Sequence, residues 1–165
     1  MSKLQGRIIL FAAIGGLFAL MGFFVFYASL DNPELEKIEI ELDSVDLKDV
    51  NSVENHATLE ISLLIKNPSE KTFTIAIISY ELFANGNSIG TGQYSTVDIP
   101  MPGRAAFYPG SEIALKNFFK LTLDDNNVQE YQSITNGENI QYSVKGEVTV
   151  ENAWSIIEKN FESSL

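Results

Sequence analysis

Cysteine is absent from this 165-residue sequence, and histidine occurs once, as His56. Without cysteine the chain has no disulfide, no thiolate nucleophile, no iron–sulfur cluster and no cysteine-based zinc site. The absence does not identify a redox compartment, because a cysteine-free chain is compatible with either side of a membrane. A zinc centre usually takes three or four histidine, cysteine or acidic ligands, so a single histidine argues against one.

Positive charge is also scarce, with 11 Lys and Arg residues against 22 Asp and Glu residues. Lys3 and Arg7 are the only charged residues among the first 30, so residues 31–165 hold nine cations and 22 acids, a formal charge of −13. Nucleic-acid binding depends on Lys and Arg side chains that neutralise phosphates, and this composition therefore excludes it. We predict no nucleic-acid partner and no cofactor.

From Ile8 to Ala28, 21 consecutive residues carry no charge and are mainly aliphatic or aromatic. As a helix this run would be about 31 Å long, which matches the hydrocarbon core of a bilayer. No side of it is polar, unlike a helix in a soluble core. We therefore predict a transmembrane anchor over residues 8–29, with the lipid bilayer as its partner through Ile8–Ala28. Small residues four positions apart would let a second helix approach closely: Ala12 and Gly16, Gly15 and Ala19.

The charges on the two sides of the span predict its orientation. The two cations precede it and acidic residues follow it, so residues 1–7 are expected in the cytoplasm and the rest of the chain outside the cell membrane. The alternative is a cleaved signal peptide, whose apolar region is about 7–15 residues long and ends in a small-residue cleavage site. Cleavage after Ala28 would require Phe26 at a position that takes a small residue, so a retained anchor is favoured.

Alternation of apolar and polar residues predicts that the chain beyond residue 34 consists of strands. Residues 30–34, which include Pro33, are predicted to be a linker that ends the anchor helix. The inward faces of the first two strands are expected to be Ile38, Ile40 and Leu42, then Ala57, Leu59, Ile61, Leu63 and Ile65. Further strands are expected at Thr72–Ala84, Asn87–Tyr94 and Ser111–Leu123, and the last clear one has Ile140, Tyr142, Val144, Val148 and Val150 on one face.

Local signals refine this pattern of strands. Asn85-Gly86 predicts a type I′ hairpin turn, which needs positive φ at both central residues. A change of phase near Ile77-Ile78 indicates a bulge, and Gly146 marks a place where another backbone passes close. Residues 124–136 are rich in turn-forming residues but could also hold a short helix, with Val128, Tyr131 and Ile134 on one side.

Together these elements predict an all-β fold, an antiparallel fibronectin-III or immunoglobulin-like β-sandwich of about seven strands, preceded by one amino-terminal transmembrane α-helix. The sandwich is expected to span residues 35–150. Residues 151–165 form a tail that is either a short helix or an edge strand, because Trp154, Ile157 and Phe161 suit both.

Two short motifs resemble a catalytic site and a calcium site, but neither has the surrounding residues that such a site requires. Gly86–Gly90 matches the G-x-S-x-G nucleophile elbow around Ser88, but that motif needs a strand–turn–helix setting and a histidine after the serine. His56 precedes it. Asp124–Glu130 resembles a calcium loop, but an EF-hand needs Gly at position 6 and Glu at position 12, where this chain has Gln129 and Thr135. We predict no enzyme, and no catalytic, cofactor-binding or metal-binding residue.

Several blocks of the sequence, in order, resemble one known family. They are Ile65–Pro68, Tyr80–Gly92, Ile99–Gly103 with Met101 at a small-residue position, and Asn136-Gly137 followed by Tyr142–Gly146. The chain thereby resembles the LEA14-type (group 2 late embryogenesis abundant, LEA type 2) proteins, also described as the water-stress and hypersensitive-response domain. The resemblance implies a fibronectin-III-like sandwich, a role in stress tolerance and no enzymatic activity. The matched residues form turns and strands, so no site residue is carried over.

The leading hypothesis is a membrane-anchored, extracytoplasmic domain that protects the membrane or neighbouring proteins during desiccation or osmotic stress, without catalysis. A compact, strongly charged domain held at a surface resists aggregation. One alternative is an accessory subunit of a membrane protein complex, docked through free sheet edges. Another is a lipid or apolar-ligand binding module with a cavity between its sheets. The last alternative is an enzyme, which would require a pocket that brings together His56, Ser88 and a carboxylate.

Overall fold

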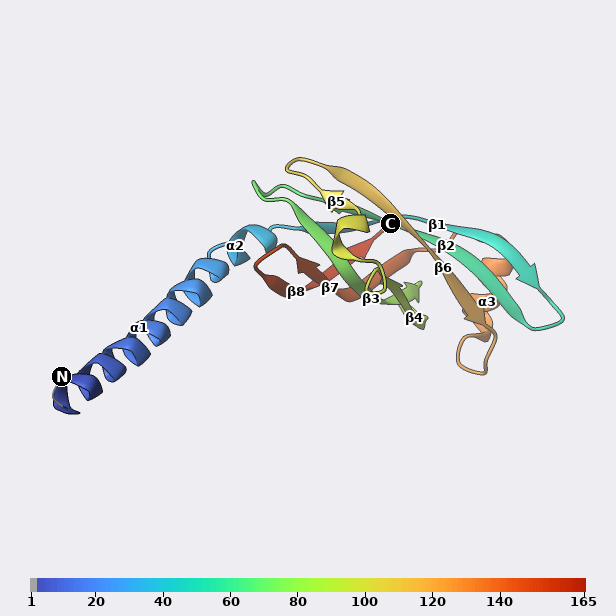
Figure 1. Cartoon of the computed structure of the whole chain (residues 1–165). Helices are drawn as coiled ribbons and strands as arrows, with labels where there is room; N and C mark the ends of the chain where they lie inside the picture. Colours follow the sequence, from blue (N-terminus) through green and yellow to red (C-terminus); the bar gives the residue numbers. More distant parts are fainter. Residues whose placement is uncertain (1–2) are drawn as a thin grey trace.

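The chain begins with one long helix, α1 (Lys3–Ser29), which projects as a rod from a two-layer β-sandwich (Figure 1). The computed structural model describes residues 3–165. Side chains of the apolar run are exposed around the whole helix, as expected for a segment without a soluble partner. By length and composition α1 can cross a membrane, and a signal sequence passes the same test.

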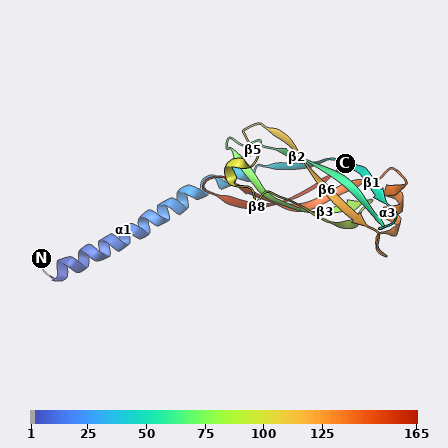
Figure 2. The ribbon, with the colours of Figure 1, turned by 45° about the vertical axis from the view of Figure 1, so that its right-hand side comes forward.

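Two antiparallel sheets follow the helix and face one another (Figure 2). The three-stranded sheet has the order β1-β2-β6, with β1 (Glu39–Asn51), β2 (His56–Lys66) and β6 (Glu112–Thr122). The other has the order β4-β3-β7-β8, with β3 (Phe73–Ala84), β4 (Asn87–Ser95), β7 (Tyr142–Glu151) and β8 (Ile156–Ser164), and β5 (Ala106–Phe107) also pairs with β3. Three short helices complete the fold: α2 (Asn32–Leu35), the 3₁₀ helix η1 (Met101–Gly103) and α3 (Val128–Thr135). The predicted β-sandwich with a preceding helix is confirmed.

The core lies between the two sheets and uses the inward faces that alternation predicted. The five inward residues of β2, Ala57 to Ile65, are at most 1% exposed. Val144, Val148 and Val150 of β7 oppose them from the other sheet, also fully buried. Each fully buried aliphatic side chain contributes about 1.5–3 kcal/mol of transfer free energy, so period-2 patterning is the main determinant of this fold.

Local signals also match the structure. Asn85 and Gly86 both have positive φ, at 51° and 85°, which confirms the type I′ turn between β3 and β4. The register of β3 against β7 shifts between Ile75 and Ile77, so the predicted bulge exists and lies one to two residues earlier. A Cβ atom added to Gly146 would meet the carbonyl oxygen of Ser79, which confirms the close backbone approach.

Two strands differ from the simple reading of the sequence. β1 continues to Asn51, far beyond the alternation that ends at Leu42, because two register shifts against β2 interrupt the period-2 pattern. The carboxyl-terminal tail is an edge strand rather than a helix, since β8 pairs with β7 along its whole length. The sandwich therefore has eight strands, one more than the approximate number predicted.

Candidate functional site

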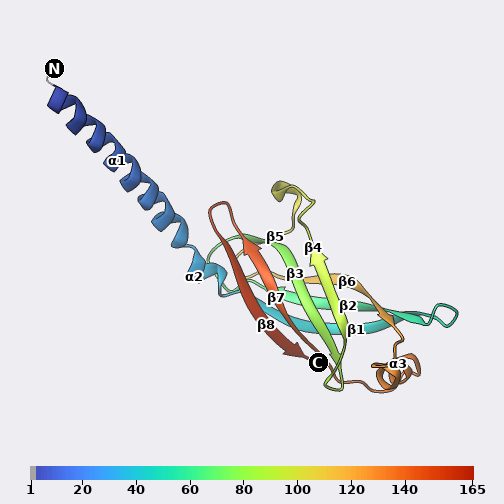
Figure 3. The same cartoon turned by 90° about the horizontal axis from the view of Figure 1, so that it is seen from below.

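The sandwich has two ends that differ in composition, and strand register assigns each loop to one of them. The near end, where α1 enters, comprises residues 30–38, 67–72, 96–111 and 152–155, because Lys66 pairs with Glu39 and Glu112, and Thr74 pairs with Glu151. The far end comprises residues 49–56, 85–86 and 123–141. Figure 3 shows α3 and the β1–β2 hairpin on the side away from α1.

The segment between α1 and β1 is bound to the near end by side-chain contacts. Asp31 accepts a hydrogen bond from the Asn152 side-chain amide at 3.1 Å and forms an ion pair with Lys71 at 3.1 Å. The Ser155 hydroxyl donates to the side-chain oxygen of Asn32. These contacts join the first residues after α1 to the β7–β8 turn, so residues 30–34 are docked on the sandwich.

Residues 34–38 continue this docking. Glu34 accepts the backbone N–H of Glu70 at 3.0 Å and a hydrogen bond from Lys37 at 2.5 Å, and the Lys37 contact is the main reason that the pKa of Glu34 lies below its ordinary value. Leu35 and Ile38 are fully buried in the core. Six residues after the last residue of α1, the chain is therefore part of the sandwich interior.

Asn67 holds the near-end loops together from inside. Its side chain is 1% exposed, and its amide NH₂ donates to the carbonyls of Lys71 and Phe107, both at 2.8 Å. Its side-chain oxygen accepts from the backbone N–H and the hydroxyl of Ser69, at 3.0 and 2.7 Å. Every donor and most of the acceptor capacity of the amide is used. Asn67 thus has a structural role, as the sequence predicted for the Asn67-Pro68 pair.

Arg104 fixes the longest near-end loop. Its guanidinium pairs with Glu151 at the end of β7, and both side chains are mostly buried. The Nε–H also donates to the carbonyl of Ile99 at 2.9 Å, and a terminal nitrogen donates to Val97 at 3.4 Å. The loop is therefore held by its backbone, while the side chains of Val97, Ile99 and Met101 remain exposed.

The β7–β8 turn places Trp154 beside the last turns of α1. The indole is 68% exposed, and together with Phe24, Val25, Tyr27 and Ala28 it lines an apolar cleft of about 370 Å³. Tyr108 is similarly exposed at the same end. Sequence reasoning considered Trp154 only as part of a helical or strand face. One feature of the sequence could have pointed to Trp154: it is the only large side chain in the short turn Asn152–Ser155.

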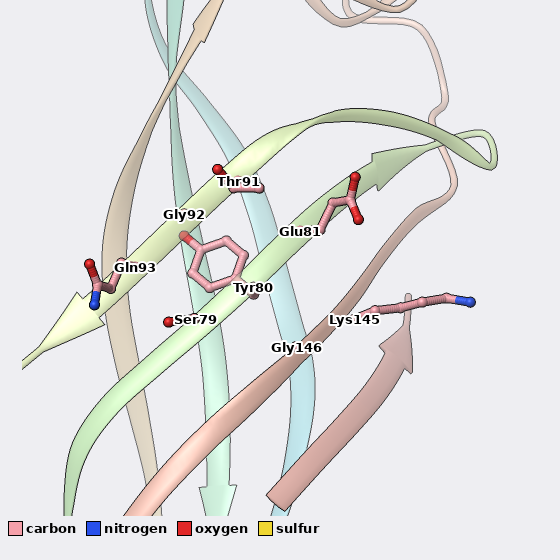
Figure 4. A pocket seen from close by; sticks show the side chains of 8 residues that line it. All are labelled: Ser79, Tyr80, Glu81, Thr91, Gly92, Gln93, Lys145 and Gly146. Carbon is pink, nitrogen blue, oxygen red and sulfur yellow. The ribbon is translucent and has the colours of Figure 1, made fainter. Parts of the chain in front are cut away.

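The outer face of the larger sheet carries a shallow hollow of about 430 Å³. It is lined by Ser79, Tyr80, Glu81, Thr91, Gly92, Gln93, Lys145 and Gly146. Figure 4 shows the polar side chains diverging from three neighbouring strands instead of converging on one point. The Tyr80 hydroxyl accepts a hydrogen bond from Asn117 at 3.0 Å, and burial raises the pKa of Tyr80. An unactivated, raised-pKa phenol without a neighbouring base offers no acid–base chemistry here.

The structure does not bring the motif residues together. Ser88 lies on β4 and donates to Glu81, whereas His56 begins β2 in the other sheet and contacts Glu54 at 3.4 Å. The acidic loop after β6 is a local turn, in which Asp124 accepts the backbone N–H of Asn126 at 2.7 Å. Among residues 3–165, no group of three or more His, Asp or Glu side chains is arranged to hold a metal ion.

Solved structures share this sandwich, although no protein-family model and no curated protein matches the chain. A solution structure from Arabidopsis thaliana, AT1g01470, is 21% identical over 77% of this chain and 80% of its own, with a TM-score of 0.51. A candidate late embryogenesis abundant (LEA) protein, At2g46140.1, is 15% identical over 93% and 88%, with a TM-score of 0.46. A protein from Archaeoglobus fulgidus is 19% identical over 76% and 94%, with a TM-score of 0.44. The first of these shows a shared fold.

Proposed function

We propose that this chain is a non-enzymatic, single-pass membrane protein whose LEA14-like sandwich stands outside the cell membrane and protects the membrane or neighbouring proteins during desiccation or osmotic stress. The observation that carries the proposal is the docked connection between an apolar helix long enough to span a bilayer and an acidic sandwich of LEA-like fold. The sequence blocks that resemble LEA14-type proteins supply the link to stress.

The distribution of charge supports this orientation and role. The two cations before the span and the acids after it follow the positive-inside bias. All six charged side chains of the far end are acids: Asp49, Glu54, Asp124, Asp125, Glu130 and Glu138. A concentrated single-sign charge attracts counter-ions and water and repels other anionic surfaces. At low water content, such a surface would keep membranes and proteins separated.

The test is survival and vesicle integrity under drying. Cells that lack the chain should lose viability after drying or salt shock, and vesicles that carry the full chain should leak less trapped dye after rehydration than protein-free vesicles. A matched variant replaces the acids at 49, 54, 124 and 125 with lysine and leaves the near end unchanged. Protection should be lost with this variant. Unchanged survival on deletion, together with unchanged leakage, would contradict the protective role.

A second candidate is an accessory subunit of a membrane protein complex, and the edge strand β4 favours it. β4 pairs only with β3 among the described strands, so one of its edges has no strand partner. A free edge of this kind accepts a strand from a partner. Mild-detergent extraction followed by native mass analysis distinguishes the two, since a stoichiometric partner favours the accessory role and a monomer favours protection.

A further inference from the structure

We propose that the near end of the sandwich is a lipid-contacting surface that rests in the headgroup layer of the leaflet from which α1 emerges, with Trp154 inserted beside the helix. This proposal rests on the proposed membrane anchoring of α1. It adds a second membrane contact and a fixed orientation, in which the far end points away from the bilayer.

The short, docked connection is the first argument. Only Leu30 and Asp31 separate the end of α1 at Ser29 from the start of α2, and side chains from the β7–β8 turn hold Asp31 and Asn32. A flexible linker would let the domain move away from the membrane, but here two residues are available. The near end therefore lies within a few residues of the surface from which α1 emerges.

The level of Trp154 along the helix is the second argument. Its indole shares a cleft with Phe24, Val25, Tyr27 and Ala28, and the predicted membrane segment ends at Ala28. At 1.5 Å of rise per residue, Phe24 lies about 6 Å before that point, so Trp154 reaches about one helical turn below the end of the apolar run. If α1 spans the bilayer to Ala28, this position is the interface, where tryptophan and tyrosine are enriched.

The composition of the rest of the near end is the third argument. In Figure 3 the β7–β8 turn and the loop that holds η1 both extend from the end at which α1 enters. Exposed large apolar side chains occur on both loops and on the connection: Leu30, Val97, Ile99, Met101, Tyr108 and Trp154. Three ion pairs at this end reduce the cost of leaving water: Asp31 with Lys71, Glu34 with Lys37, and Glu151 with Arg104. Three further acids, Glu36, Glu70 and Asp98, are exposed there and can stay in water at the headgroup level. This combination suits a lipid interface.

Trp154 is the only tryptophan in the chain, which makes its fluorescence specific for this site. The full chain is reconstituted in phosphatidylcholine vesicles, some containing phosphatidylcholine brominated near the headgroup, and the indole emission is measured with and without aqueous iodide. We expect strong quenching by the brominated lipid, a blue-shifted emission, and quenching by iodide reduced about threefold relative to an exposed indole, as an interfacial position requires.

The matched control moves the only tryptophan to the far end. Val53 is 92% exposed at the tip of the β1–β2 hairpin, so Val53→Trp combined with Trp154→Phe should be quenched by iodide and unaffected by brominated lipid. Equal iodide quenching at both positions, with no effect of brominated lipid on Trp154, would overturn the lipid-contacting surface. An alkaline wash of the same vesicles separates this outcome from failure of the anchor, because a protein released by the wash has no embedded α1 and refutes both proposals.

Discussion

The two ends of the sandwich are made from the same kinds of loops but differ in how those loops are held and what they expose. At the near end a buried amide, ion pairs and hydrogen bonds fix the loops, and aromatic and aliphatic side chains project from them. At the far end the charged side chains are all acidic, and no aromatic side chain there is among the exposed large apolar residues. The exposed large apolar side chains of the far end are the valines at 50, 53 and 128, so the contrast lies in aromatic residues and charge, and it supports the proposal that the near end contacts lipid.

Asn67 provides the strongest test of this difference in rigidity. Asn67→Ala removes four side-chain hydrogen bonds and takes the amide donor away from the buried carbonyl of Phe107, so the free energy of unfolding should fall by about 3 kcal/mol. Asn127 at the far end is also buried but makes two such bonds, and Asn127→Ala should cost about 1 kcal/mol. Thermal unfolding of the full chain in detergent, followed by circular dichroism of the sheets, measures both. Equal losses would refute a specially fixed near end.

Arg104 gives the next largest effect. Arg104→Leu leaves Glu151 mostly buried without its partner, and we expect a loss of about 2 kcal/mol together with faster amide exchange in residues 97–104. The control is Lys145→Leu, which removes an exposed pair with Glu162 and should change stability by less than about 0.5 kcal/mol. If exchange in the loop is unchanged by Arg104→Leu, the guanidinium does not hold it.

The sequence predicted the sandwich because its core depends on period-2 alternation, and every second residue from Ala57 to Ile65 is apolar and buried. It missed the far half of β1, where register shifts at Leu42 and Leu47 interrupt the alternation. It also missed the role that we propose for Trp154. That role depends on contacts between residues about 120 positions apart, such as Asn152 with Asp31, and no local pattern reports such pairing. Local sequence patterns thus predict individual strands and turns. The arrangement of the near-end loops depends on tertiary contacts, which such patterns do not reveal.

The contacts between α1 and the sandwich are expected to control orientation more than stability. Asn152→Ala combined with Ser155→Ala removes the contacts to Asp31 and Asn32 and also the two bonds that the Asn152 side-chain oxygen accepts from the backbone N–H groups of Trp154 and Ser155. Because this turn is partly exposed, the free energy of unfolding should fall by only about 1–2 kcal/mol. The double substitution should, however, clearly broaden the distance between spin labels placed by Leu20→Cys and Val97→Cys, which is feasible because the chain has no native cysteine. The control is Thr135→Ala, which removes a far-end hydrogen bond to Tyr131 and should leave the distance distribution unchanged.

Protonation of Glu34 in acid should lower the stability of the near end by a small amount. Hydrogen bonding to Lys37 holds the pKa of Glu34 below its ordinary value of 4.5, and contact with Lys116 does the same for the pKa of Glu60 on β2. Since the folded-state pKa is the lower one, each group contributes stability above pH 4.5, and that contribution is lost as the pH falls through the folded-state value. Melting temperatures of Glu34→Gln and Glu60→Gln should therefore approach that of the parent chain in acid. Only Glu34→Gln should also loosen residues 67–72, where Glu34 accepts the N–H of Glu70.

The most direct test of the account is the sidedness of the far end in intact cells. The cysteine-free chain allows Val53→Cys at the far end and Lys3→Cys at the first residue of α1 to be compared with a membrane-impermeant maleimide. The account predicts that the cysteine at position 53 is labelled in intact cells and remains membrane-bound after an alkaline wash, whereas the cysteine at position 3 is labelled only after lysis. Labelling of position 53 only after lysis, or recovery of a mature chain free in solution, would contradict it.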